Sequence, residues 1–299
     1  MGLRLVQVCV IINSSSGTVA QAGSSLAPAA VELAFREAGL HPEIHYVSAA
    51  DLAATVRAGL AKRPDAVVVG GGDGTLSSVA GILVDGETPL GILPFGTLNH
   101  FSKDLQISDD LVRAVAIIAA QHVRRVDVAE VNGRVFLNNC SIGAYPEAVR
   151  RRDELREDRG HGKWWSMTFA SLEVLRNLRR LRVQLTVDQQ TVARRTPVVL
   201  ISNNRYTGHL FSRSLRGQMD AGEIWVYTTR SHRFFPLLRL AFLAALGRLD
   251  QAEDFESWSA KQVTLTVPGS SLKAGIDGWR RSSWLRPCPL WELGSTKKF

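Results

Sequence analysis

The chain has 299 residues, of which 45% are hydrophobic and 21% are charged, so it is expected to be a globular protein of one large or two ordinary domains rather than a disordered or fibrous one. Its formal net charge of +8 at pH 7 favours anionic partners, which include nucleotides, nucleic acids and acidic lipid surfaces. The three cysteines are far apart and have no metal-binding spacing, which argues against disulfides and structural zinc and favours buried thiols in a reducing compartment.

The apolar segments are too short for a membrane protein of the helical kind. No stretch reaches the roughly 18–20 apolar residues that a spanning helix needs. The first residues, MGLRLVQVCVIIN, lack the long apolar run and the cleavage site of a signal peptide. These features predict a cytoplasmic protein.

Strand-like and helix-like segments alternate through the first 100 residues. Short loops join them, and this alternation predicts a parallel sheet covered by helices on both faces. The expected strands are residues 5–12, 43–48, 65–72 and 89–96, and the expected helices are residues 24–39, 49–60 and the segment after Gly74. Two glycine-containing loops, at residues 70–75 and 96–99, follow the third and fourth strands. Ligands of such sheets bind beyond the carboxyl ends of the strands, so these two loops are the candidate binding loops.

The pattern changes after about residue 125. The segment RRVDVAEVNGRVFLNNCSIG predicts a hairpin that turns at Asn132-Gly133. A charged stretch and an apolar helix around residues 164–177 follow, and short strands then recur, interrupted by a helix at 234–249. We therefore expect an N-terminal α/β domain, residues 1–125, and a mainly antiparallel β second domain, residues 126–286.

The stretch VVVGGGDGTL contains an aspartate where its glycines would suit a phosphate. Consecutive glycines before a helix leave backbone N–H groups bare, which makes an anion-binding concavity, although a simple tight turn is an equally good interpretation. Asp73 fits beside phosphates if a cation bridges them or if it accepts a proton from an attacking hydroxyl. It also fits as a helix N-cap, and both roles can hold together. Thr75 adds a hydroxyl for phosphate or metal.

GGGDGTL, followed about twenty residues later by GILPFGTLNHF, resembles the diacylglycerol kinase catalytic superfamily of lipid kinases. The two motifs are specific as a pair. Weaker matches are IINSSSG at 11–17, the segment LNNCSIGAYPEAV, the turn and strand RGQMDAGEIWVY, and AGIDG at 274–278. The resemblance implies a two-domain enzyme of lipid metabolism and phospholipid biosynthesis, in which the strand at about 287–299 packs back on the first domain.

The implied activity is ATP- and Mg²⁺-dependent transfer of the γ-phosphoryl group to a lipid hydroxyl. The acceptor would be diacylglycerol-like or sphingoid, bound in the cleft between the two domains. Residues placed near the nucleotide are Asn13, Gly17, Ser48 (in place of a threonine), Gly71, Gly72, Asp73, Gly74, Thr75, Gly96, Thr97 and Asn99. Asp73 is the preferred base and a magnesium ligand, with Asp277 as the alternative base and Asp220 as a second metal ligand.

Several positions depart from the family pattern. Ser77 and Ser78 stand where an acidic or amide residue is usual, and His100 replaces an aspartate. Ala221 interrupts the usual Asp-Asp-Gly turn, and Trp279 replaces the glutamate of the final motif. A lost general base costs about 10²–10⁴ in rate. A nucleotide- or lipid-binding protein of the same fold with weak or lost activity is therefore the second hypothesis, and an NAD-kinase-like activity is a third.

Two segments, one charged and one largely apolar, are relevant to the choice of binding partners. Arg159 and Lys163 belong to a charged loop that is either a solvated face or a source of contacts to ATP phosphates. The helix at 234–249 combines apolar residues with arginines, as in a core helix, in the wall of a substrate groove or in peripheral contact with an anionic membrane. No nucleic-acid-binding motif is present in the sequence, and homodimer formation is left open.

Overall fold

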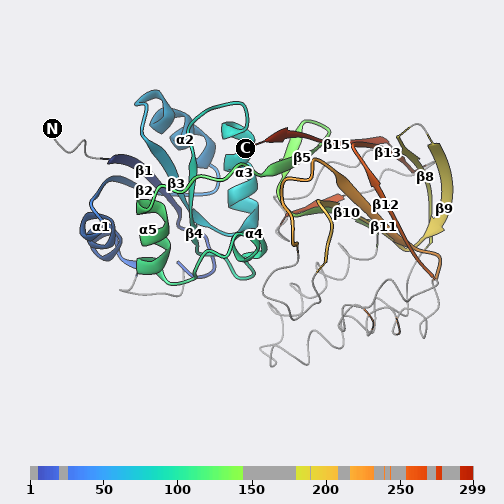
Figure 1. The fold of residues 1–299 in the computed structure, drawn as a ribbon, viewed down its shortest axis with the longest axis horizontal. Coiled ribbons are helices and arrows are strands. Elements are labelled where there is room, and N and C mark those ends of the chain that lie inside the picture. The colour runs from blue at the N-terminus through green and yellow to red at the C-terminus, as the bar shows by residue number, and fades with distance from the viewer. Residues whose placement is uncertain are drawn as a thin grey trace. The chain divides into compact units, whose positions relative to one another are not determined.

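The structure is a computed structural model that describes residues 6–19, 26–143, 180–188, 190–207, 216–231, 239, 243, 254–267, 274–277 and 290–298. The chain divides into two compact units. The first comprises residues 1–128, 135–137 and 297–299, and the second comprises residues 129–134 and 138–296. Figure 1 labels elements of both units.

The first unit is built on a four-stranded parallel sheet. Its strands are β1 (Val6–Asn13), β2 (Leu40–Val47), β3 (Ala66–Gly71) and β4 (Leu90–Pro94). They lie in the order β2-β1-β3-β4, and each neighbouring pair is parallel. The central strands β1 and β3 are runs of valine and isoleucine, which is typical of parallel strands covered on both faces.

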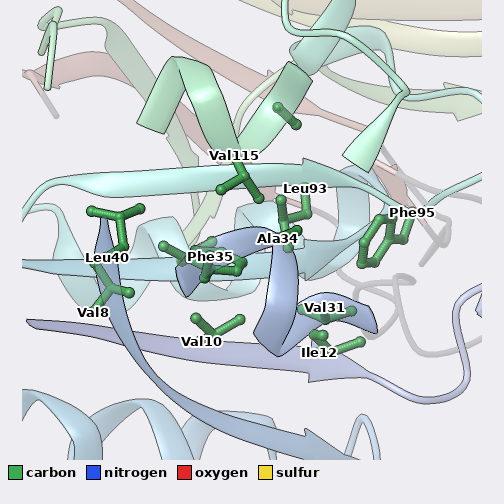
Figure 2. Packing of buried hydrophobic residues seen from close by; sticks show 12 residues of the cluster. Val8, Val10, Ile12, Val31, Ala34, Phe35, Leu40, Leu93, Phe95 and Val115 are labelled. Atoms are coloured by element: carbon green, nitrogen blue, oxygen red, sulfur yellow. The ribbon is translucent and has the colours of Figure 1, made fainter. Parts of the chain in front are cut away.

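Among the described residues of the first unit, five helices accompany this sheet. They are α1 (Pro28–Glu37), α2 (Leu52–Ala61), α3 (Asp73–Leu83), α4 (His100–Asp104) and α5 (Leu111–Ala119). Alternate residues of β1 show which helices cover which face. Val8, Val10 and Ile12 pack with residues of α1 and α5 in one buried cluster (Figure 2). Cys9, on the other face, packs against Gly59 of α2, and α2 contacts α3.

The second unit contains two mainly antiparallel sheets. One has the order β12-β11-β10-β7-β14, and the other has the order β6-β5-β15-β13-β8-β9. The first three strands of the second sheet, β6, β5 and β15, are divided between the two units. The strands are β5 (Asp127–Val131), β6 (Arg134–Phe136), β7 (Asn139–Gly143), β8 (Leu181–Val187), β9 (Gln190–Thr196), β10 (Val198–Asn203), β11 (Ile224–Thr229), β12 (Phe255–Ala260), β13 (Gln262–Thr266), β14 (Ala274–Ile276) and β15 (Leu290–Lys298).

The fold class predicted from the sequence is confirmed: an α/β parallel sheet is followed by mainly antiparallel strands. The expected hairpin is β5 and β6, and it turns at Asn132 and Gly133, whose φ angles are 47° and 78°. Asn-Gly suits such a turn because both central residues need positive φ. Helix α1 is shorter than the expected 24–39, and Pro28 stands at its start. In the described part of the chain, no helix has the length and hydropathy to cross a membrane.

Candidate functional site

Three loops of the first unit meet at the carboxyl edge of the parallel sheet, after β1, β3 and β4. The chain places β2 on one side of β1 and then crosses over to place β3 and β4 on the other side, which gives the order β2-β1-β3-β4. The boundary between β1 and β3 is therefore the topological switch point of the sheet. Ligands of open α/β sheets bind at this switch point. Asn13 is the last residue of β1 and Gly71 is the last of β3, so two of the predicted site residues flank it.

Asn13 joins the first loop to the glycine loop after β3. Its side-chain amide donates a hydrogen bond of 2.9 Å to Thr75 Oγ1, and its oxygen accepts the backbone N–H of Ser15 at 3.0 Å. Only 7% of Asn13 is exposed, so this cross-link is held in a buried setting. Thr18 makes the next connection, because its hydroxyl donates to the Gly96 carbonyl oxygen at 3.1 Å.

The two glycine loops touch through their backbones. A Cβ atom added at Gly96 would lie 2.3 Å from the Gly72 Cα and 2.5 Å from Asn99 Oδ1. A Cβ atom at Gly71 would lie 2.6 Å from Thr75 Cβ, and one at Gly17 would lie 3.0 Å from Thr97 Oγ1. Gly96 therefore cannot be replaced without moving backbone, so glycine at this position is a requirement of the close approach of the two loops.

Asp73 joins the glycine loop after β3 to the loop after β4. Its Oδ1 accepts the backbone N–H of Phe101 at 2.9 Å, and its Oδ2 accepts that of His100 at 3.1 Å. These are the first N–H groups of α4, so the Asp73 carboxylate satisfies donors that lack partners within that helix. Asp73 is also the first residue of α3, where its charge is favourable.

Asn99 holds the second glycine loop in its shape. It has a φ of 51°, in the left-handed region that asparagine tolerates better than most residues. Its Oδ1 accepts the Gly96 N–H at 2.9 Å, and its Nδ2 donates to the Pro94 and Gly96 carbonyl oxygens at 2.9 and 3.0 Å. The side chain is thus committed to its own loop, which it braces.

Ser16 was not predicted from the sequence. It lies in the loop after β1, it is 5% exposed, and its hydroxyl has no hydrogen-bond partner in the described structure. A buried hydroxyl without a partner is costly, and a ligand oxygen would relieve that cost. Ser16 precedes Gly17 directly. A serine before a glycine in a loop at a strand end is the signal that could have found it.

Ser77 and Ser78, the two serines that depart from the family pattern, have structural roles. The Ser77 hydroxyl donates to the Asp73 carbonyl oxygen and that of Ser78 to the Gly74 carbonyl oxygen, each at 2.9 Å. They therefore bond back along α3, as serine often does inside a helix. Ser48, after β2, is exposed and donates to Asp51 Oδ2 at 2.6 Å, so its side chain is bonded to the residue that precedes α2.

Asp277 lies in the second unit, where it is 4% exposed. Both of its carboxylate oxygens accept the Asn138 N–H at 2.9 Å, and Oδ1 also accepts the Asn139 N–H at 2.7 Å. The buried Arg216 donates to Asn138 Oδ1 at 2.7 Å, which extends this network. Burial and the Asp277 charge both raise the pKa of the neighbouring Cys140 thiol, so that thiol stays protonated.

The other predicted site residues are Asp220, Arg159 and Lys163. Asp220 is exposed beside Gly222, whose φ is 71°. Arg159 and Lys163 lie outside the described residues, as does Trp279. Across the described ranges, no three histidine, cysteine or acidic side chains are grouped as metal ligands. A magnesium ion that is held largely by substrate phosphates needs only one or two protein carboxylates, and Asp73 is the residue of the glycine loop that would provide one.

Residues 7–131 match the diacylglycerol kinase catalytic domain. A diacylglycerol kinase of Staphylococcus haemolyticus is 40% identical over 81 residues, which are 26% of this chain and 24% of that protein. A second protein of that species, which its name places among the lipid kinases, is 32% identical over 146 residues, or 48% of this chain and 47% of the relative. The chain therefore spans about half or less of the length of these two relatives.

Longer matches are more distant. A diacylglycerol kinase of Bacillus subtilis is 22% identical over 249 residues, which cover 82% of this chain and 81% of that protein. The crystal structure of a diacylglycerol kinase from Bacillus anthracis superposes with a TM-score of 0.69 at 20% identity, covering 99% of this chain and 96% of that one. The resemblance to the diacylglycerol kinase catalytic superfamily is thus confirmed, and residues 7–131 match its catalytic domain.

Proposed function

We propose that the protein is an ATP-dependent lipid kinase that transfers the γ-phosphoryl group to a lipid hydroxyl. One observation carries this proposal. Hydrogen bonds cross-link three loops at the switch point of a parallel sheet, and two glycines there leave the backbone uncovered by side chains. The names of the relatives support the same activity, since they are lipid or diacylglycerol kinases. A diacylglycerol-like or sphingoid acceptor is consistent with these names.

The first-unit residues have distinct roles in this proposal. The N–H groups at the start of α3 and along the glycine loop would bind phosphate oxygens, and the Ser16 hydroxyl would donate to another. Asp73 would hold magnesium, which neutralises charge on the phosphates. Asn13 and Asn99 keep the loops at their spacing, because their side chains bond to Thr75 and to the second loop.

Phosphoryl transfer depends mainly on positioning and on charge neutralisation, so few reacting side chains are needed. Asp73 is the preferred acceptor for the alcohol proton because its carboxylate belongs to the glycine loop itself, at the start of α3. Asp277 is the less suitable candidate. Backbone N–H groups of Asn138 and Asn139 bind its carboxylate in a buried network.

A second candidate function is nucleotide or lipid binding with weak or lost transfer. It is favoured by Ser77 and Ser78, whose hydroxyls bond to α3 carbonyls where the family usually has acidic or amide residues. The commitment of Asp277 to backbone N–H groups favours it as well. These features reduce the number of side chains available for proton transfer but leave the glycine loops intact.

The test is transfer of label from γ-labelled Mg·ATP to a panel of lipids, namely diacylglycerol, phosphatidylglycerol, sphingosine and ceramide, with NAD as a further acceptor. We expect label in one of the lipids. Asp73→Asn should lower the rate by about 10²–10⁴ because a base or metal ligand is lost. Ser78→Ala is the matched control in the same helix, and its rate should equal that of the unaltered protein because its hydroxyl bonds only within α3.

The outcomes separate the candidates. Label in NAD rather than in lipid would replace the proposal with an NAD-kinase-like activity. Binding of Mg·ATP without transfer to any acceptor would favour the second candidate. Equal rates for Asp73→Asn and the unaltered protein would refute the assigned role of Asp73.

A further inference from the structure

Helix α5 of the first unit presents an apolar face to solvent. Its inner side is buried through Ala114 and Val115, which belong to the core cluster with α1. On its outer side, 62% of Val112 and 43% of Ile117 are exposed, and in the segment that follows, 70% of Val123 is exposed. Exposed large apolar side chains that recur on one helix indicate contact with another apolar medium, because water is a poor environment for them.

Arginines are interleaved with these apolar residues. Arg113 is exposed on the outer face of α5, and Arg124 and Arg125 are exposed after it, beside His122. Residues 111–126 contain no aspartate or glutamate. In the sequence, Asp109 and Asp110 precede the segment at the beginning of the helix, where Asp110 accepts the Arg113 N–H at 2.9 Å. The exposed charged side chains of residues 112–125 are therefore arginines, which stand near the two ends of the segment.

We propose that this surface, residues 112–125, docks the first unit on an anionic lipid bilayer. Apolar side chains can enter the boundary between headgroups and acyl chains, while interleaved arginines meet the negative headgroups. The positive charge of this surface distinguishes a lipid bilayer from a second copy of the chain. A second copy docking through the same face would bring its own arginines against these, and like charges oppose that contact. A nucleic acid would meet the arginines but leave Val112, Ile117 and Val123 in water.

This inference does not depend on the kinase activity, because docking needs neither nucleotide nor transfer. It places membrane contact on described residues of the first unit, whereas the apolar helix expected at 234–249 lies almost wholly outside the described residues. Residues 112–125 are on the α1 side of the parallel sheet, since α5 contacts α1 and β4. Arginines on α2, which covers the other face, provide a matched comparison.

The test is co-sedimentation of the full chain with vesicles of equal parts phosphatidylglycerol and phosphatidylcholine, and with vesicles of phosphatidylcholine alone. We expect binding to the anionic vesicles that weakens with salt. Arg113→Gln with Arg125→Gln should weaken it about thirtyfold, since each arginine near an anionic surface contributes about fivefold. Val112→Ser with Ile117→Ser should weaken binding to the same vesicles at every salt concentration.

The control is Arg57→Gln with Arg63→Gln, which removes the same charge from exposed positions at α2 and should leave binding unchanged. Thermal melts of each variant establish that it is folded. Failure of the unaltered protein to bind anionic vesicles overturns the inference, and so does equal weakening by the control pair. A dimer in sedimentation that Val112→Ser with Ile117→Ser dissociates would instead assign the face to a second copy.

Discussion

At the scale of single residues, Asp73 connects two motifs that are separate in the sequence. The sequence predicted Asp73 as a site residue from its glycine loop, and it left open whether the carboxylate caps a helix. The structure shows that it caps α4, a different helix from its own, through the N–H groups of His100 and Phe101. Sequence reasoning could not find those partners, because they depend on β3 and β4 being adjacent in the sheet.

Removal of the Asp73 carboxylate should destabilise the first unit. Asp73→Ala leaves the Phe101 N–H buried without an acceptor, and we expect a loss of about 2 kcal/mol in the free energy of unfolding. Asp73→Asn keeps one acceptor oxygen, so its free energy of unfolding should fall by less. Urea denaturation measures both, with the exposed Glu87→Ala as control, for which a change within about 0.5 kcal/mol is expected. An Asp73→Ala protein as stable as this control would show that the two hydrogen bonds contribute nothing.

At the scale of elements, Glu256 of β12 joins the two sheets of the second unit. It accepts from Arg194 of β9, with Nε at 2.8 Å and Nη2 at 3.1 Å, and from Arg230 after β11. Burial of the Glu256 carboxyl raises its pKa, but the hydrogen bonds and charges of both arginines outweigh burial and hold the pKa below its ordinary value. The sequence predicted recurring short strands in this region but did not identify β9 or β12. It could not pair Arg194 with Glu256, because 62 residues separate them.

This link should make stability depend on pH. A carboxyl whose pKa is lowered by folding stabilises the protein above its unfolded value of about 4.3, and this contribution disappears as the pH falls through the folded pKa. Glu256→Gln should therefore cost about 2 kcal/mol at neutral pH and close to nothing in strong acid. Urea denaturation across the pH range measures the difference. Glu37→Gln, an exposed change on α1, is the control, and a pH-independent loss for Glu256→Gln would contradict the assignment.

At the scale of the whole molecule, the sequence was sufficient for the fold class but not for the strand order. Alternating strands and helices joined by short connections predicted the parallel sheet, because this alternation is typical of parallel α/β folds. In the second unit β7 lies between β10 and β14, and β15 lies between β5 and β13, so neighbours come from distant parts of the chain. The paired glycine motifs predicted the superfamily and most of the candidate site. Ser16 and Arg216 were missed, because their significance depends on burial that no motif encodes.

The central claim is that the two glycine loops form one phosphate-binding site, and binding of Mg·ATP tests it most directly. Calorimetry should show binding by the unaltered protein and a loss of at least about tenfold in affinity for Gly96→Ala, since its Cβ would push the loops apart at Gly72. Gly81→Ala in α3 is the matched control, because its Cβ meets only Val135 at 3.5 Å, and its affinity should be unchanged. The account would be contradicted if the unaltered protein bound no Mg·ATP, or if a folded Gly96→Ala protein bound it equally well.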